Sequence, residues 1–197
     1  TKSLSSSGDG LLAFNWNLGE AVGVVPMNNK TVQTNFIVRS VGADPSKAYF
    51  DGGNWGVREG RKYAAYYPFV GELVASDASL SYSFKGQKQI ASGNTSHLDA
   101  YSVMYAAAQS AADGKALFSF EHKISLLRFD VTMPAAGVFK KAVVTSDAAC
   151  FAASGTLSLS DGSFAGSSPA TETVLDIDNV SVSEGGVLTL WLAVCPT

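Results

Sequence analysis

The chain offers few residue types at spacings that could support catalysis. Its two histidines are His97, in a polar stretch, and His122, between Glu121 and Lys123 in an apolar-alternating stretch. Serine is abundant, but no G-x-S-x-G sequence nominates one serine as a nucleophile. We therefore expect His122 to be a structural imidazole, hydrogen-bonded to a neighbouring strand, and not a catalytic base. The chain is predicted not to be an enzyme, and no cofactor is expected.

A pair of carboxylates, Asp176 and Asp178, is spaced i, i+2. In a strand this spacing places both carboxylates on one face. A calcium site would need further oxygen ligands nearby, and the next residue, Asn179, would face the other way. Glycosidase chemistry needs two carboxylates across a cleft, which the sequence alone does not place. We interpret the pair as a solvated strand face and predict no metal site.

Aromatic side chains gather between Trp55 and Tyr67. Exposed rings stack on sugars, and Trp55 and Tyr66 are the candidates for such a site. The same residues could instead form the core of a β-sandwich. Strand alternation would place Tyr63 and Tyr67 on one face, with Tyr66 on the other.

The two cysteines, Cys150 and Cys195, lie far apart and lack metal-ligand spacing. If they lie on adjacent strands, they could form a disulfide. That bond would close a loop of about 45 residues and contribute a few kcal/mol in the chain-entropy model. The alternative is two buried thiols without a bond.

Composition narrows the functional class. The 197 residues include 46% hydrophobic but only 16% charged residues, with a net charge of −3. Without a basic patch, nucleic acid is not expected as a partner. No apolar run approaches the roughly 18 residues of a membrane helix, and no signal peptide is visible in the chain. This balance favours an exported β-protein.

Apolar alternation predicts ten or more short strands separated by turn signals, an arrangement typical of an antiparallel sandwich or barrel. We expect the longest alternating stretch, residues 118–133, to form one strand or two short ones, with the other strands packed around it. Residues 187–194 form a nearly continuous apolar run, which predicts a strand buried on both faces. Residues 100–112 are rich in alanine, yet we expect an extended segment with at most one helical turn. The other predicted strands are 11–16, 21–25, 31–41, 61–69, 138–145, 151–159 and 174–182.

The first ten residues, rich in serine and glycine, are predicted to be a flexible tail. Residues 11–197 are then assigned to one β-sandwich domain. The apolar run that stops just before Thr197 leads us to expect that the natural protein continues, with this domain at its N-terminal side.

Several segments in order resemble the fimbrillin-like (Mfa-like) proteins of Bacteroidales, the subunits and tip components of type V pili. The segments are 14–24, 61–69, 103–106, 118–131 and 188–196. The family's first motif, Phe-x-Trp-x-x-Gly-Asp-x-Ile-Gly-Val, is matched by Phe14, Trp16, Gly19, Gly23 and Val24, with Glu20 and Val22 as departures. The later motifs are matched by Tyr66, Tyr67 and Pro68, and by Phe120, His122, Ser125 and Leu127. Ser102 stands where the family usually has Asp.

The resemblance implies an all-β, antiparallel β-sandwich of transthyretin-like (Greek-key) architecture with little helix. It also implies a structural or adhesive role at the cell surface or outer membrane, after export as a lipoprotein. Its partners would be other pilus subunits, in a homo- or hetero-polymer, and host or bacterial surface glycans or proteins. Subunits would join by strand addition, in which a strand of the next subunit fills a groove. The alternative is a surface glycan-binding lipoprotein on a similar sandwich.

Overall fold

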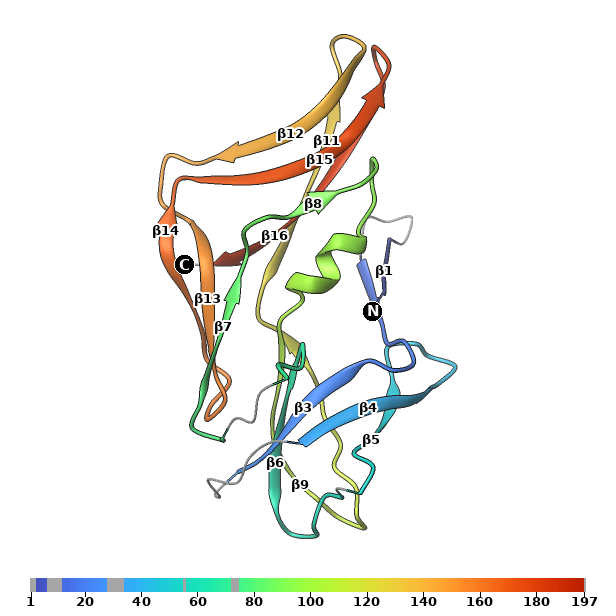
Figure 1. Ribbon diagram of the computed structural model, residues 1–197, viewed down its shortest axis with the longest axis vertical. Helices are drawn as coiled ribbons and strands as arrows, with labels where there is room; N and C mark the ends of the chain where they lie inside the picture. The colour runs from blue at the N-terminus through green and yellow to red at the C-terminus, as the bar shows by residue number, and fades with distance from the viewer. Residues whose placement is uncertain (1–2, 7–11, 28–33, 55, 72–74, 197) are drawn as a thin grey trace. The chain divides into compact units, whose positions relative to one another are not determined.

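The computed structural model describes residues 3–6, 12–27, 34–54, 56–71 and 75–196 (Figure 1). The chain divides into two compact units. The first comprises residues 1–80, 102–123 and 157–164, and the second comprises residues 81–101, 124–156 and 165–197. The assignment of residues 11–197 to one domain does not include this division and stays a prediction.

The predicted all-β class is confirmed. Within the described residues the one helical element is the 3-10 helix η1 (Ser96–Tyr101), and no helix there is long and apolar enough to cross a membrane. The alanine-rich stretch is mostly extended as predicted, since it forms β9 (Met104–Ser110) after η1 ends. The transthyretin-like topology stays a prediction.

A six-stranded antiparallel sheet dominates the first unit. Across the sheet the order is β10 (Glu121–His122), β9, β6 (Lys62–Tyr67), β3 (Ala21–Pro26), β4 (Thr34–Val41) and β5 (Ala48–Asp51). A separate hairpin pairs β1 (Ser3–Ser6) with β2 (Leu12–Asn15). Strand β1 therefore lies within the stretch that the sequence predicts to be a flexible tail.

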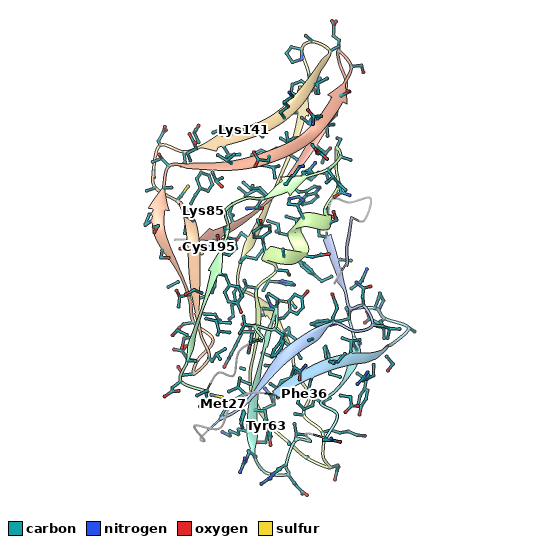
Figure 2. The ribbon with its side chains drawn as sticks, in the orientation of Figure 1. Met27, Phe36, Tyr63, Lys85, Lys141 and Cys195 are labelled. Carbon is teal, nitrogen blue, oxygen red and sulfur yellow. The ribbon has the colours of Figure 1, made fainter. Side chains whose placement is uncertain are left out.

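The central strands of this sheet are buried on both faces. On β6, Tyr63, Ala65 and Tyr67 join one apolar cluster with side chains of β3, β4 and β9, while Tyr66 faces the other way and has no exposed surface. Figure 2 labels Phe36 on β4 and Tyr63 on β6, which belong to that cluster. The predicted split of the tyrosines between two faces is confirmed.

The second unit contains a sandwich. One of its layers pairs β11 (Ser125–Thr132) with β16 (Val187–Pro196), and the other pairs β12 (Gly137–Thr145) with β15 (Glu172–Val182) and β8 (Lys88–Gln89). Its core is made by Leu188, Leu190 and Leu192 of β16 together with Leu175 and Ile177 of β15. The pairing of β8 with β15 is parallel, whereas β11 with β16, β12 with β15 and β13 with β16 pair antiparallel. The strand order of the β16 sheet continues through β13 (Phe151–Ser158) to β14 (Phe164–Ala170), and β7 (Ser79–Ser83) also pairs with β13.

The prediction that residues 118–133 form the centre of the fold is wrong. The stretch forms two strands, β10 and β11, and each lies at the end of its sheet. Alternation marks a strand with one exposed face, whereas strands buried on both faces appear as continuous apolar runs. The central strands are accordingly β3, β6 and, as predicted, β16, in which Trp191, Leu192 and Ala193 are all buried.

Candidate functional site: an apolar groove

The first unit contains a groove of about 790 Å³. Its borders are the two ends of the six-stranded sheet. On one side lie residues 46–51, which include the whole of β5, and on the other lie residues 114–120 with His122 of β10. Because both end strands line the same hollow, the groove is the gap that separates the ends of one curved sheet.

Side chains of the inner strands form the floor of the groove. Val22 and Val24 of β3, Phe36 of β4 and Met104 of β9 all line it. Val22, Val24 and Met104 are each at most 2% exposed, so the floor is a packed apolar surface. Phe14 and Trp16 line the groove too, from β2 and the residue that follows it.

Trp16 connects the floor to both borders. Its ring centroid lies 4.9 Å from that of Phe50 on β5, and 5.5 Å from that of Phe120 beside β10. On the floor side it lies 5.6 Å from Tyr67 of β6, at an interplanar angle of 90°. Edge-to-face packing of this kind adds about 0.5–1.5 kcal/mol per pair beyond area burial. Trp16 therefore fixes the spacing of the two borders.

The rim of the groove is polar and carries charges of both signs. Lys47 and Lys115 line it together with Asp51. Asp51 lies 3.9 Å from Arg39 of the neighbouring strand, and Lys47 lies 3.3 Å from Asp44. These pairs are exposed, so they contribute little to stability. An apolar floor inside a charged rim suits a partner that buries apolar side chains and keeps polar groups at its margins.

One of the two histidines of the chain lies in the lining of the groove. Its lining contains one imidazole, that of His122, whose side chain is exposed and whose ring centroid lies 3.7 Å from that of Phe14. This ring packs against an aromatic side chain, and the structural hydrogen bond expected for His122 stays a prediction. Across the described residues, no three His, Cys, Asp or Glu side chains gather closely enough to hold a metal ion.

His97, Asp176 and Asp178 belong to the second unit. His97 is in η1, where its Nε2 lies 3.1 Å from the carbonyl oxygen of Trp191, and burial lowers the pKa of its imidazole. Asp178 is half exposed and forms an ion pair of 3.1 Å with Lys88. Asp176 is also exposed, which fits the interpretation of a solvated strand face.

Tyr66, one of the two proposed sugar-stacking residues, lies in the core of the sheet. Tyr66 is fully buried in the sheet, so its ring has no surface to offer a sugar. The interpretation of Tyr66 as a ligand-stacking residue is therefore corrected to a core role. Trp55 lies outside the described residues.

The cysteines are not joined to each other. Both lie in the described part of the chain, where Cys150 is exposed and Cys195 is buried in β16 and labelled in Figure 2. The structure therefore shows neither the proposed bond nor two buried thiols, the alternative from the sequence. Desolvation raises the pKa of the Cys195 thiol.

The role of the aromatic side chains on the two borders was not predicted from the sequence. Phe50, Phe118 and Phe120 pack against the cluster around Trp16 without being fully buried. The available signal was the alternation of Phe14 with Trp16 and of Phe118 with Phe120. It identifies side chains on a common face but not which segments border one hollow.

Comparison with protein families places most of the chain in one of them. The model of the fimbrillin-like family matches residues 11–190. Comparisons with curated proteins and with solved structures gave no match. The matched range includes the whole groove and all strands from β3 to β15. The chain belongs to the fimbrillin-like family.

Proposed function

We propose that this protein is a structural or adhesive subunit of a cell-surface type V pilus. The observation that carries this proposal is the family match over residues 11–190. Family membership suggests a fimbrial location and interaction with other pilus subunits. The family is structural, and we propose a structural role for this chain as well.

We further propose that subunits join by strand addition at the apolar groove. An added strand binds through main-chain hydrogen bonds to a sheet edge, and its alternate side chains enter pockets. In the described sheet, β5 pairs with β4 alone and β10 with β9 alone, so each has one side open to a further strand. The floor beside these edges supplies the apolar surface that alternate side chains would bury.

The chemistry of the groove limits what the incoming strand can be. Its inward side chains should be apolar, because Val22, Val24 and Met104 form the floor. Its outward side chains can be polar or charged, since Lys47 and Asp51 at the rim present both signs. A strand of another pilus subunit with alternating apolar residues meets both conditions.

The pilus role is tested by electron microscopy of the native cell surface, labelled with antibody to this chain. We expect label along filaments or at their ends. Label spread over the cell body without filaments would contradict the role. Cells that lack the gene for this chain serve as the control for antibody specificity.

Strand addition at the groove is tested by a charge placed inside it. Phe118→Glu puts a carboxylate on the border, and Leu18→Glu puts one on a side chain that is 69% exposed and outside the groove. We expect the first variant to fold but to be absent from filaments, and the second to be incorporated normally. Circular dichroism and melting temperature establish folding before incorporation is compared. Normal incorporation of a folded Phe118→Glu chain would exclude this groove as the acceptor.

Replacement of Tyr66 by alanine does not test the glycan-binding alternative. The residue is part of the core, so the variant would lose stability whether or not the chain binds sugar. That alternative depended on two exposed stacking rings, those of Trp55 and Tyr66. The buried position of Tyr66 leaves its ring unable to contact a sugar. We therefore propose pilus subunits as the partners of this chain.

A further inference from the structure

The outer edge of β16 is closed by side chains instead of a neighbouring strand. On one side β16 pairs with β11 from Val187 to Val194. On its other side, within the described residues, it pairs with β13 at Cys195 and Pro196 and with no further strand along residues 187–194. This leaves a long edge on the most continuously apolar strand of the chain, and such an edge is a template for pairing with other chains.

Two glutamine side chains occupy that edge. The Gln87 amide donates from Nε2 to the carbonyl oxygen of Ala193 at 2.7 Å, and its Oε1 accepts the Ala193 N–H at 2.8 Å. The Gln89 amide repeats the pattern further along β16. Its Oε1 accepts the Trp191 N–H at 2.9 Å, and its Nε2 donates to the carbonyl oxygen of Thr189 at 2.8 Å.

The remaining backbone N–H and C=O groups of this edge form hydrogen bonds with residues that follow Gln89 in the chain. The Thr189 N–H donates to Oγ of Ser92 at 2.9 Å. The Trp191 carbonyl oxygen lies 3.1 Å from Nε2 of His97, and the Thr189 carbonyl oxygen also accepts the Gly93 N–H at 2.8 Å. Both backbone groups of Thr189, Trp191 and Ala193 therefore have partners in residues 87–97, which we call the cap segment.

Burial shows that the two amides belong to the interior. Gln87 and Gln89 are both 0% exposed, although glutamine is mostly found at protein surfaces. A primary amide offers a donor and an acceptor side by side, as the backbone of a neighbouring strand does. Each glutamine thus replaces one residue of a missing strand.

The backbone of the cap segment is held by the opposite layer of the sandwich. β8 pairs in parallel with β15, at Asp176 with Lys88 and Ile177 with Gln89. The Asp176 N–H also donates to the carbonyl oxygen of Gln87 at 2.9 Å. The segment can therefore direct its glutamines to β16 without joining that sheet, and Figure 1 shows β8 and η1 beside β16.

We propose that the cap segment closes the β16 edge against strand addition by a second copy of this chain. This role of the cap segment rests on the proposed assembly by strand addition. A subunit that accepts strands from its neighbours must restrict the edges at which they pair. Closing the most apolar edge leaves the other edges of the molecule for regulated pairing. Loss of the two amides would convert β16 into an unregulated acceptor.

Hydrogen exchange of the wild-type chain gives the first test. The amides of Trp191 and Ala193 face the cap segment, and those of Leu190 and Leu192 face β11, because successive backbone groups alternate in direction. We expect all four to be protected. Exchange of the Trp191 and Ala193 amides at the rate of an open edge would overturn the proposal.

The second test removes the amides and keeps the side-chain volume. In the Gln87→Met/Gln89→Met variant we expect the Trp191 and Ala193 amides to exchange roughly ten- to a hundredfold faster. In sedimentation velocity this variant should form larger species than the wild-type chain at equal concentration. Gln109→Met, on an exposed position of β9, is the matched control and should behave as wild type.

A folded double variant that stays the same size as wild type would overturn the proposal. If the double variant does not fold, Gln89→Met alone is measured in the same ways. Faster exchange of the Trp191 amide without any increase in sedimentation coefficient would also overturn the proposal. These measurements use the purified chain. Absence of filament labelling would therefore not change the outcome of the exchange and sedimentation experiments. Negative results in those experiments would in turn leave the proposed pilus role unaffected.

Discussion

The indole ring of Trp16 meets the ring of Phe50 edge-on, with centroids 4.9 Å apart and 87° between the planes. Phe50 belongs to β5, one end of the six-stranded sheet, and Trp16 also lies 5.5 Å from Phe120 beside the other end. One buried side chain therefore holds the two borders of the groove at a fixed separation. The shape of the groove depends on this residue.

Replacement of Trp16 by alanine should destabilise the chain by about 3–5 kcal/mol, because it leaves a cavity where three aromatic contacts meet. Trp16→Phe, which retains a ring, should cost less. Urea unfolding at constant pH measures both. Leu18→Ala, at a side chain that is 69% exposed, should stay within about 0.5 kcal/mol of wild type. Equal stability of Trp16→Ala and Leu18→Ala would contradict the role given to Trp16.

Gly162 cannot carry a side chain in this fold. Its φ is +73°, and an added Cβ would lie 2.2 Å from Cδ1 of Tyr105. The ring of Tyr105 is held in place, because its hydroxyl donates to the carbonyl oxygen of Leu159 at 3.1 Å and the residue is 3% exposed. Gly162→Ala should therefore lower the free energy of unfolding by more than about 3 kcal/mol, which combines overpacking with backbone strain.

Gly185→Ala separates these two contributions. Gly185 has a φ of +72° but nothing within 4 Å of an added Cβ, so its cost should be strain alone, about 1–2 kcal/mol. Thermal unfolding of both variants measures the difference. A Gly162→Ala variant no less stable than Gly185→Ala would show that the Tyr105 contact is easily relieved.

Acidification should destabilise the chain through His97. Burial holds the pKa of this imidazole below its usual value of 6.5, because the charged form loses hydration. Nε2 donates to the carbonyl oxygen of Trp191, while Nδ1 is buried and has no hydrogen-bond partner among the described residues. As the pH falls below 6.5, the unfolded chain binds a proton that the folded chain does not, so the stability due to His97 declines.

His97→Gln should flatten this decline between about pH 7 and 5, since glutamine keeps a donor for Trp191 and does not titrate there. Denaturant unfolding at a series of pH values is the measurement. Leu18→Gln, at a side chain that is 69% exposed and carries no titrating group, is the control and should retain the wild-type slope. An unchanged slope in His97→Gln would assign the pH dependence to other groups.

The two thiols should differ in reactivity. The thiolate is the reactive form, and burial both shields Cys195 and raises its thiol pKa. Iodoacetamide should therefore modify the native chain once, at Cys150, and twice after unfolding. Intact mass followed by peptide mapping identifies the site. Absence of labelling without a reductant, with labelling after reduction, would show a disulfide that the structure lacks.

Sequence patterns anticipated the strands whose environment is uniform along their length. The apolar run in β16 predicted burial on both faces, and the alternation of Tyr63 and Tyr67 against Tyr66 predicted their separation across the sheet. Strand β14 was not predicted, because Pro169 and serines in it indicate a loop. These signals depend on near neighbours in the chain, which is why local sequence carries them.

The sequence by itself determined the all-β class, the family and which side chains share a strand face. Tertiary structure alone decided that residues 118–133 lie at sheet ends, that the two ends of one sheet border a groove, and that Gln87 and Gln89 close the edge of β16. The glutamines and Ala193 or Thr189 are about one hundred residues apart along the chain. No local pattern encodes such a pairing, because a glutamine becomes a strand substitute only when folding removes it from water and presents it to an unpaired backbone edge.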